Sequence, residues 1–248
     1  MSDATVGDST VGDATAVAGW YGKLAALGDF ASRRLPPAFV TWWDEWLQRS
    51  IAVSRTQLGD GWLPTYLKSP IWRFALLPSL CGASGWAGIV MPSVDRVGRY
   101  FPLTVAVALE PGDTVLARVA GADAWFDVVE RLALATLNPS FGATDLDRGL
   151  AEQPLAAVDA VAVASGLGPL GLAAWWRSPP EHPFLAELDS TRSLGPTLAL
   201  AAQAIMGTLG ERRSLWWTRD GRAGAAALRC YPGMPPFGDF VHMMNTGR

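Results

Sequence analysis

From Phe74 to Val94 the chain carries no charged residue, and this stretch limits the possible folds more than any other. An apolar run of this length could cross a membrane as a helix. However, it is interrupted by residues that disfavour a helix interior, which are Pro78, Gly82, Ser84, Gly85, Gly88 and Pro92. The pattern instead predicts strand, loop and strand within the core of a globular domain, with strands over residues 71–77 and 86–91.

The chain is long and apolar enough to bury a large core. It has 248 residues, of which 50% are hydrophobic, and such a chain forms one large domain or two small ones. Residues 1–18 nearly repeat themselves ("ATVGDSTVGDAT") and contain no aromatic residue, which predicts a disordered leader. No low-complexity linker divides the remainder, so we expect a single domain over residues 19–248.

The charge balance excludes some classes of function. The formal net charge is −3, but Asp3, Asp8 and Asp13 all lie in the leader, so 20 basic side chains face 20 acidic ones (23 less these three) in the body. A neutral body does not predict a nucleic-acid binder. The absence of a basic amphipathic helix disfavours a membrane-surface adaptor, and we expect no membrane insertion. The N-terminus lacks the pattern of a signal peptide, so we expect a cytoplasmic protein.

Apolar spacing predicts the other helices and strands. Residues 38–58 are expected to form a helix that places Trp42, Trp43 and Trp46 on one face. Further helices are expected over 123–137, within 145–153 and over 196–209, and strands over 19–24, 103–109, 214–218 and 225–230; residues 155–172 fit a strand or a loop. Because strands and helices do not alternate strictly, we predict an α/β fold with a mixed, largely antiparallel sheet flanked by helices.

Few residues suggest catalysis. Cys81 and Cys230 lie far apart, which favours buried free thiols in a reducing compartment. His182 and His242 have no partner pattern and are interpreted as structural. "GKLAALGDF" lacks the spacing of a phosphate loop, and "GASGW" lacks that of a nucleophile elbow. No metal or cofactor is expected.

Three tryptophan pairs invite a functional interpretation. Core packing is the better explanation for Trp42, Trp46 and Trp216, because tryptophan buries a large area. Trp175 and Trp176 stand beside "RSPP" and are candidates for contact with a partner.

The segment "PSVDRVGRYFP", residues 92–102, places three charges in a glycine-containing loop between two apolar strands. Asp95 can accept backbone hydrogen bonds or pair with Arg99, and Gly98 permits a positive φ. We expect Arg99 to bridge to Asp29 of "LGDF" and so to tie the N-terminal segment to the sheet. The competing hypothesis is a hydrolase or transferase that uses Asp29, Asp95 and Arg99 in a pocket. The residues of this motif are Gly22, Gly28, Asp29, Phe30, Pro92, Ser93, Asp95, Gly98, Arg99, Phe101 and Pro102.

The segments "GWYGKLAALGDFASRRLPPAFVTWWDEWLQ" and "WAGIVMPSVDRVGRYFPLTVAVAL" resemble the TagF family, also called ImpM, of type VI secretion accessory proteins from Gram-negative bacteria. The similarity is strongest over residues 19–109 and continues more weakly to about residue 215. One departure is Ala25, where family members often carry proline, and it affects only the rigidity of a local turn.

The resemblance implies a three-layer α/β/α sandwich and a cytoplasmic, non-enzymatic regulator. Such a regulator represses the secretion system after translation by binding and sequestering its forkhead-associated (FHA) scaffold protein. Some relatives carry a fused phosphatase domain, for which this chain is too short. Because interfaces favour arginine and aromatic residues, the partner-binding candidates are Lys23, Arg33, Arg34, Arg96, Trp175 and Trp176.

Overall fold

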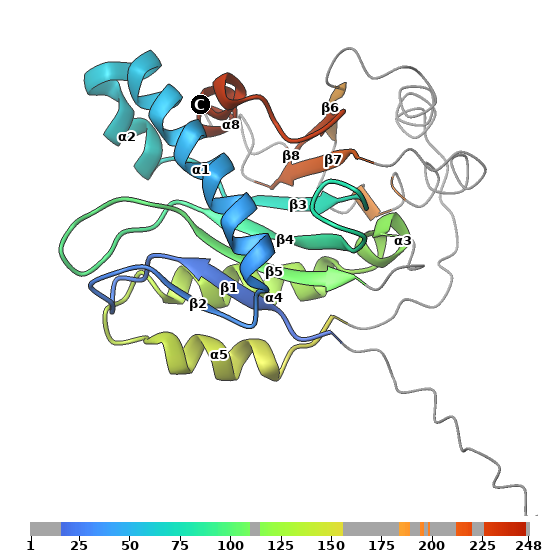
Figure 1. The fold of residues 1–248 in the computed structure, drawn as a ribbon, viewed down its shortest axis with the longest axis horizontal. Helices are drawn as coiled ribbons and strands as arrows, with labels where there is room; N and C mark the ends of the chain where they lie inside the picture. Colours follow the sequence, from blue (N-terminus) through green and yellow to red (C-terminus); the bar gives the residue numbers. More distant parts are fainter. Residues whose placement is uncertain are drawn as a thin grey trace, which may run out of the picture.

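The computed structural model describes residues 16–109, 115–155, 184–188, 194–195, 198, 212–219 and 226–246. The strands described in these ranges form one eight-stranded sheet with the order β2-β1-β5-β4-β3-β7-β8-β6, and each described pair is antiparallel (Figure 1). The strands are β1 (Gly19–Gly22), β2 (Ala31–Arg33), β3 (Trp72–Leu76), β4 (Gly85–Met91), β5 (Leu103–Leu109), β6 (Phe184–Leu188), β7 (Ser214–Thr218) and β8 (Ala226–Tyr231).

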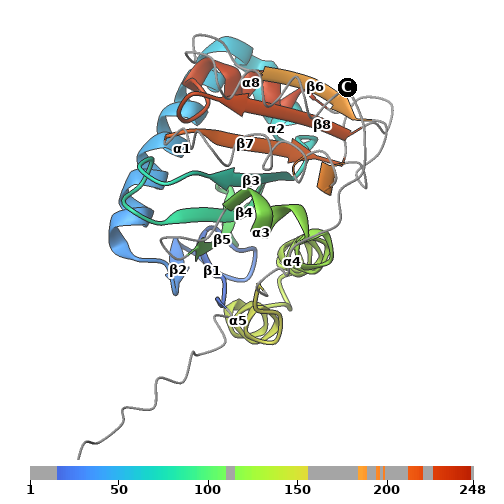
Figure 2. The same cartoon turned by 90° about the vertical axis from the view of Figure 1, so that its right-hand side faces the viewer.

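Helices lie against both faces of this sheet (Figure 2). One face carries α1 (Pro37–Leu58), α2 (Trp62–Leu67) and α8 (Phe240–Met244), with the short 3-10 turns η1 (Gly59–Gly61) and η4 (Phe237–Asp239) at their ends. The other face carries α3 (Val115–Ala120), α4 (Asp123–Ala135) and α5 (Ala143–Ala151). The apolar strands β3, β4 and β5 are buried almost throughout because helices cover both of their sides.

Helix α1 begins with Pro37, which suits a first helical turn because its missing N–H would have no helical partner there. Its buried stripe includes Trp43 and Trp46. The Trp43 ring stacks on that of Trp216 in β7 at 5.9 Å between centroids, and its indole N–H donates to Thr104 of β5 at 2.8 Å. Aromatic packing therefore fixes α1 across the centre of the sheet.

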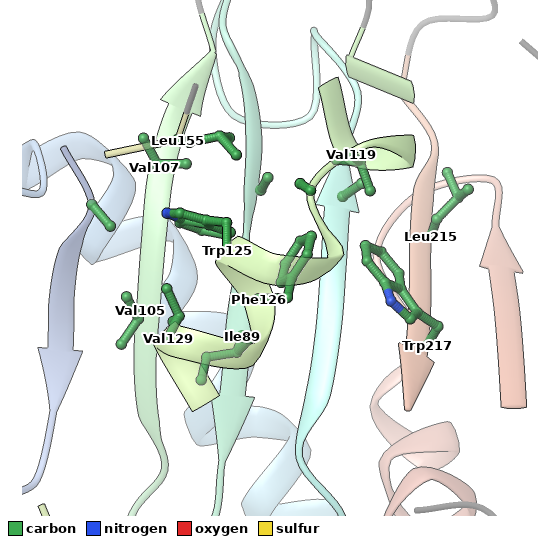
Figure 3. Packing of buried hydrophobic residues seen from close by; sticks show 14 of the residues in the cluster. Ile89, Val105, Val107, Val119, Trp125, Phe126, Val129, Leu155, Leu215 and Trp217 are labelled. Carbon is green, nitrogen blue, oxygen red and sulfur yellow. The ribbon is translucent and has the colours of Figure 1, made fainter. Parts of the chain in front are cut away.

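The opposite core layer is built around α4 (Figure 3). Trp125, Phe126 and Val129 point from α4 towards the sheet, where Figure 3 shows Ile89 and Val105 beneath them. Within this layer, Phe126 also meets the Trp217 ring edge to face at 5.1 Å.

The structure confirms the α/β fold and the apolar run 74–94 as strand, turn and strand. Most expected boundaries are accurate to within two residues, including β5 and β7 without error. All described strand pairs are antiparallel, which meets the expectation of a largely antiparallel sheet, and no parallel pair occurs among them. Residues 156–172 and most of 196–209 lie outside the described ranges.

Sequence patterns missed five short segments, namely β2, α2, α3, β6 and α8. The helices among them and β2 contain three to six residues each, too few for a periodic pattern to emerge. Strand β6 is as long as β3 and β7, so its length does not explain the miss. Part of the expected leader also belongs to the body: Ala16 pairs with Leu155, and Ala18 is fully buried. None of the helices in the described ranges is both long enough and apolar enough to cross a bilayer.

Candidate functional site

Two loops lie side by side at one end of the sheet, and we call them the loop pair: residues 23–30, between β1 and β2, and residues 92–102, between β4 and β5 (Figure 1). The sheet order explains their proximity. Strands β1 and β4 flank β5 on its two sides and run antiparallel to it, so both of them end where β5 begins. Met91 pairs with Leu103, and Tyr21 pairs with Thr104.

Main-chain groups connect the two loops directly. The backbone N–H of Arg96 donates to the carbonyl of Leu27 at 2.8 Å, and the guanidinium of Arg99 donates to the carbonyl of Gly28. The expected bridge from Arg99 to Asp29 is present but long, at 3.9 Å between two exposed groups. At the tips of the loops the tie therefore uses backbone carbonyls, which no sequence pattern marks, rather than the expected bridge to Asp29.

Ser93 anchors the base of the second loop. Its hydroxyl donates to the carbonyl of Lys23 at 2.7 Å, while its own backbone exchanges two hydrogen bonds of 2.9 Å with the hydroxyl of Tyr66 in α2. Pro92 and Pro102 bound the loop next to the strands. Ser93 thus connects this loop both to the first loop and to α2.

The carboxylate of Asp95 is the centre of the loop pair. One oxygen accepts the backbone N–H groups of Val97 and Arg99 at 3.0 and 2.9 Å. The other accepts Lys23 Nζ at 2.8 Å and Arg99 Nε at 2.7 Å. Burial by itself raises the pKa of this carboxyl, but the hydrogen bonds outweigh burial and hold the pKa well below its usual range. Four donors occupy the four acceptor positions of a carboxylate, so none is left for proton transfer to a substrate.

Two glycines allow the backbone turns that the loops require. Gly22 has a φ of +137°, and a Cβ at this position would lie 2.2 Å from the carbonyl oxygen of Pro102. Gly98 has a φ of +84°, with open space around it, and its N–H donates to the Asp95 carbonyl at 3.0 Å. Gly22 thus permits close approach of two strands, whereas Gly98 permits only a left-handed turn.

The outer surface of the loop pair carries both apolar and charged side chains. Phe30 is 44% exposed and Val97 65% exposed. The Phe30 ring meets Phe101 edge to face at 4.8 Å, and Lys23 Nζ lies 4.9 Å from its centroid. Arg96 is exposed beside them. The sequence indicated a structural role for Phe30 and no role for Val97, although an apolar residue among charged loop neighbours is a visible signal.

Lys23, a candidate for partner contact, is buried rather than exposed. Its side chain is only 5% exposed because its ammonium group is buried against Asp95. The structure thus uses this lysine to neutralise a buried carboxylate, and the two residues are 72 positions apart in the sequence.

Arg33 and Arg34 lie away from the tip of the loop pair and face Asp147 of α5, at 3.7 and 3.2 Å. Arg34 also donates to the Ala18 carbonyl at 2.9 Å. Arg33 and Arg34 thus tie the edge strand β2 to α5, although Arg33 stays largely exposed. Trp175 and Trp176 lie outside the described residues.

The remaining tryptophans, the cysteines and the histidines lie outside the loop pair. Trp46 and Trp216 are packed in the core as expected, while Trp42 is half-buried. Both cysteines are free thiols, with Cys230 buried and Cys81 only partly so. His242 is exposed in α8, and His182 lies outside the described ranges.

The two best-defined hollows in the described residues do not include the residues that a hydrolase or transferase would use here. An open groove of about 500 Å³ lies between α1 and the segment that precedes α8, and a small hollow of about 20 Å³ lies near Tyr66. Neither is lined by Asp29, Asp95 or Arg99. We call the larger one the aromatic groove; its lining residues are Trp42, Glu45, Trp46, Arg49, Met234, Pro235, Pro236 and Phe237. Across the described part of the chain, no group of three or more His, Cys, Asp or Glu side chains could hold a metal ion.

Comparison with known proteins places the chain in a family. Residues 19–153 match the TagF N-terminal domain, which is described as type VI secretion system-associated. The crystal structure of PA0076 from Pseudomonas aeruginosa PAO1 is similar, with a TM-score of 0.66 and 37% sequence identity over 93% of this chain and 94% of that chain. A comparison with curated proteins found no match. The family match includes both loops of the loop pair and covers more than half of the sequence, and the chain belongs to the TagF family of type VI secretion system-associated proteins.

Proposed function

We propose that this protein is a non-enzymatic, post-translational repressor of type VI secretion in a Gram-negative bacterium, and that it acts by binding the FHA-domain scaffold protein of the system in the cytoplasm. The observation that supports this most directly is the loop pair. It is held by internal hydrogen bonds, yet it presents arginine and aromatic side chains to solvent. Arginine and aromatic residues are enriched at protein interfaces.

Repression by sequestration needs no chemical step. A protein that occupies the scaffold lowers the free scaffold available for assembly, and the degree of repression follows from affinity and relative abundance. The saturated carboxylate of Asp95 supports this proposal over the hydrolase or transferase, because a general base needs an accessible lone pair.

The three-layer α/β/α sandwich is part of the same proposal. It is supported by helices on both faces of the described sheet (Figure 2). Sheet strands that come from residues 19–22 and 226–231 support a single domain, since both belong to one sheet.

Titration calorimetry of the purified chain against the full-length FHA-domain scaffold from the same secretion cluster tests the function. We expect saturable binding with a dissociation constant of about 1 μM or tighter, equivalent to about −8 kcal/mol. An FHA-domain protein from outside the secretion system is the matched control and should not bind. Absence of both heat and co-purification with the cognate scaffold would refute sequestration.

A further inference from the structure

We infer that the tip of the loop pair is a preformed docking surface with Phe30 and Val97 at its centre and Arg96 and Arg99 at its rim. Its partner is a protein face that offers an apolar pocket bordered by carboxylates. The inference rests on the proposed function for the identity of the partner, the FHA-domain scaffold. It adds the location of the contact and the chemistry of the opposing face.

The apolar centre of the surface is formed by two exposed side chains; Leu134 and Leu137, at the end of α4, are a second such pair in the described residues. Large apolar side chains that remain exposed are few among the described residues, and two of them, Phe30 and Val97, lie on adjacent loops that are hydrogen-bonded to each other. Scattered single exposures need no explanation, but neighbouring ones on connected loops mark an interaction site.

The Phe30 ring is held in place before any partner arrives. It meets Phe101 at 4.8 Å and lies nearly parallel to the Tyr21 ring at 6.0 Å. An aromatic side chain has only two side-chain torsions to order, and here its neighbours already restrict them. Phe30 can therefore enter a pocket on a partner with little further loss of conformational entropy.

The charge on the surface is positive. Lys23 and Arg99 both pair with the buried carboxylate of Asp95, and Arg99 also lies 3.9 Å from the exposed Asp29. With Arg96, three cations therefore face two anions. The guanidinium of Arg96 forms no hydrogen bond or ion pair with any residue in the described ranges and lies near Gly28. A complementary partner face therefore carries carboxylates where it meets these arginines.

The aromatic groove is the main alternative surface, and its charges argue against it. Its rim pair, Arg49 and Glu45, is already joined at 2.6 Å. The Trp46 indole already donates to the Pro235 carbonyl at 2.9 Å. Its charged groups are thus paired within the protein, whereas Arg96 is not, so the groove serves as the negative control.

The test measures scaffold binding by three variants of the full chain. Phe30→Ala should weaken binding by about 10- to 30-fold, as truncation of a central interface residue does. Arg96→Glu should weaken it by about tenfold, because the reversed rim charge would repel the carboxylates of the partner. Arg49→Glu, a reversal of another exposed charge, in the aromatic groove, should leave the dissociation constant within twofold. Because all three side chains are exposed, melting curves should show that each variant remains folded.

Salt supplies a second measurement. Wild-type affinity should fall between about 50 and 300 mM salt because screening weakens exposed ion pairs, and Arg96→Glu should reduce this salt dependence. If the wild type binds but Phe30→Ala and Arg96→Glu bind equally well, or if only Arg49→Glu fails, the docking surface is wrong while the proposed function stands. If the wild type does not bind the scaffold, both are wrong.

Discussion

Asp95 is a buried anion that joins the two loops of the loop pair. Its two oxygens gather donors from a lysine in one loop and an arginine and backbone groups in the other. The sequence predicted that Asp95 accepts backbone N–H groups or pairs with Arg99, and both predictions are confirmed. The contact with Lys23 could not be predicted because it depends on the order of strands in the sheet.

The stability that Asp95 provides should depend on pH. Its pKa is lower in the folded protein than the value of about 3.9 expected in an unfolded chain. The carboxylate therefore favours folding above about pH 4, and this contribution is lost as the pH falls from there towards the folded pKa. The melting temperature of Asp95→Asn should lie well below that of the wild type at pH 6, and this difference should become smaller as the pH is lowered to 3. Thermal melts of both proteins across this range test the prediction, and a difference that does not change with pH would contradict it.

Gly22 and Gly98 both have positive φ values but should differ in their tolerance of alanine. The added Cβ of Gly98→Ala lies in open space, so the free energy of unfolding should fall by only about 1–2 kcal/mol, from the strain of the left-handed backbone. Gly22→Ala adds a Cβ 2.2 Å from a backbone oxygen, so the strands must separate and the loss should be clearly larger. Urea unfolding of both variants provides the comparison, and equal losses would show that the close approach is unimportant.

The length of a helix decided whether the sequence could predict it. Apolar periodicity predicted both helices because each is long enough to show a buried stripe. Short segments such as α2 and α8 depend on tertiary contacts, including the Trp72 indole that donates to the Met243 carbonyl at 3.2 Å. Such contacts leave no local pattern, which explains why these segments were missed.

Trp43 should carry much of the stability that α1 derives from the sheet. Trp43→Ala removes a fully buried ring together with its hydrogen bond to Thr104 and should destabilise the fold by about 3–5 kcal/mol. Trp42→Ala, one residue earlier and half-buried, should lose less than half as much. Chemical denaturation measures both losses. A larger loss for Trp42→Ala would contradict the described packing.

Arg73 attaches α4 to β3 through charge. Its side chain is 1% exposed and contacts Asp127 and Glu130 at 2.5 Å each. Arg73→Ala should cost about 3 kcal/mol, at the lower end for a broken buried pair, because Arg219 still reaches Glu130 at 2.6 Å. Arg148→Ala breaks a pair of similar length, 2.6 Å, on the exposed side of α5 and should change stability by less than about 1 kcal/mol. Similar effects in the two variants would show that burial does not set the strength of these pairs.

At the scale of the whole molecule, the sheet order creates the candidate site. Residues 23–30 and 92–102 become neighbours because β1 and β4 both pair with β5. The sequence identified both segments as one motif and predicted that they are tied together. It could not separate the buried charge, Lys23, from the exposed charge, Arg96, since burial depends on which loops meet.

Amide hydrogen exchange of the full chain, with and without the FHA-domain scaffold, tests the central claim most directly. We expect slower exchange in residues 24–30 and 94–101 on binding, while residues 234–237 beside the aromatic groove stay unchanged. Protection confined to the groove or to other faces, with the loop pair unaffected, would contradict this account of how the protein binds its partner.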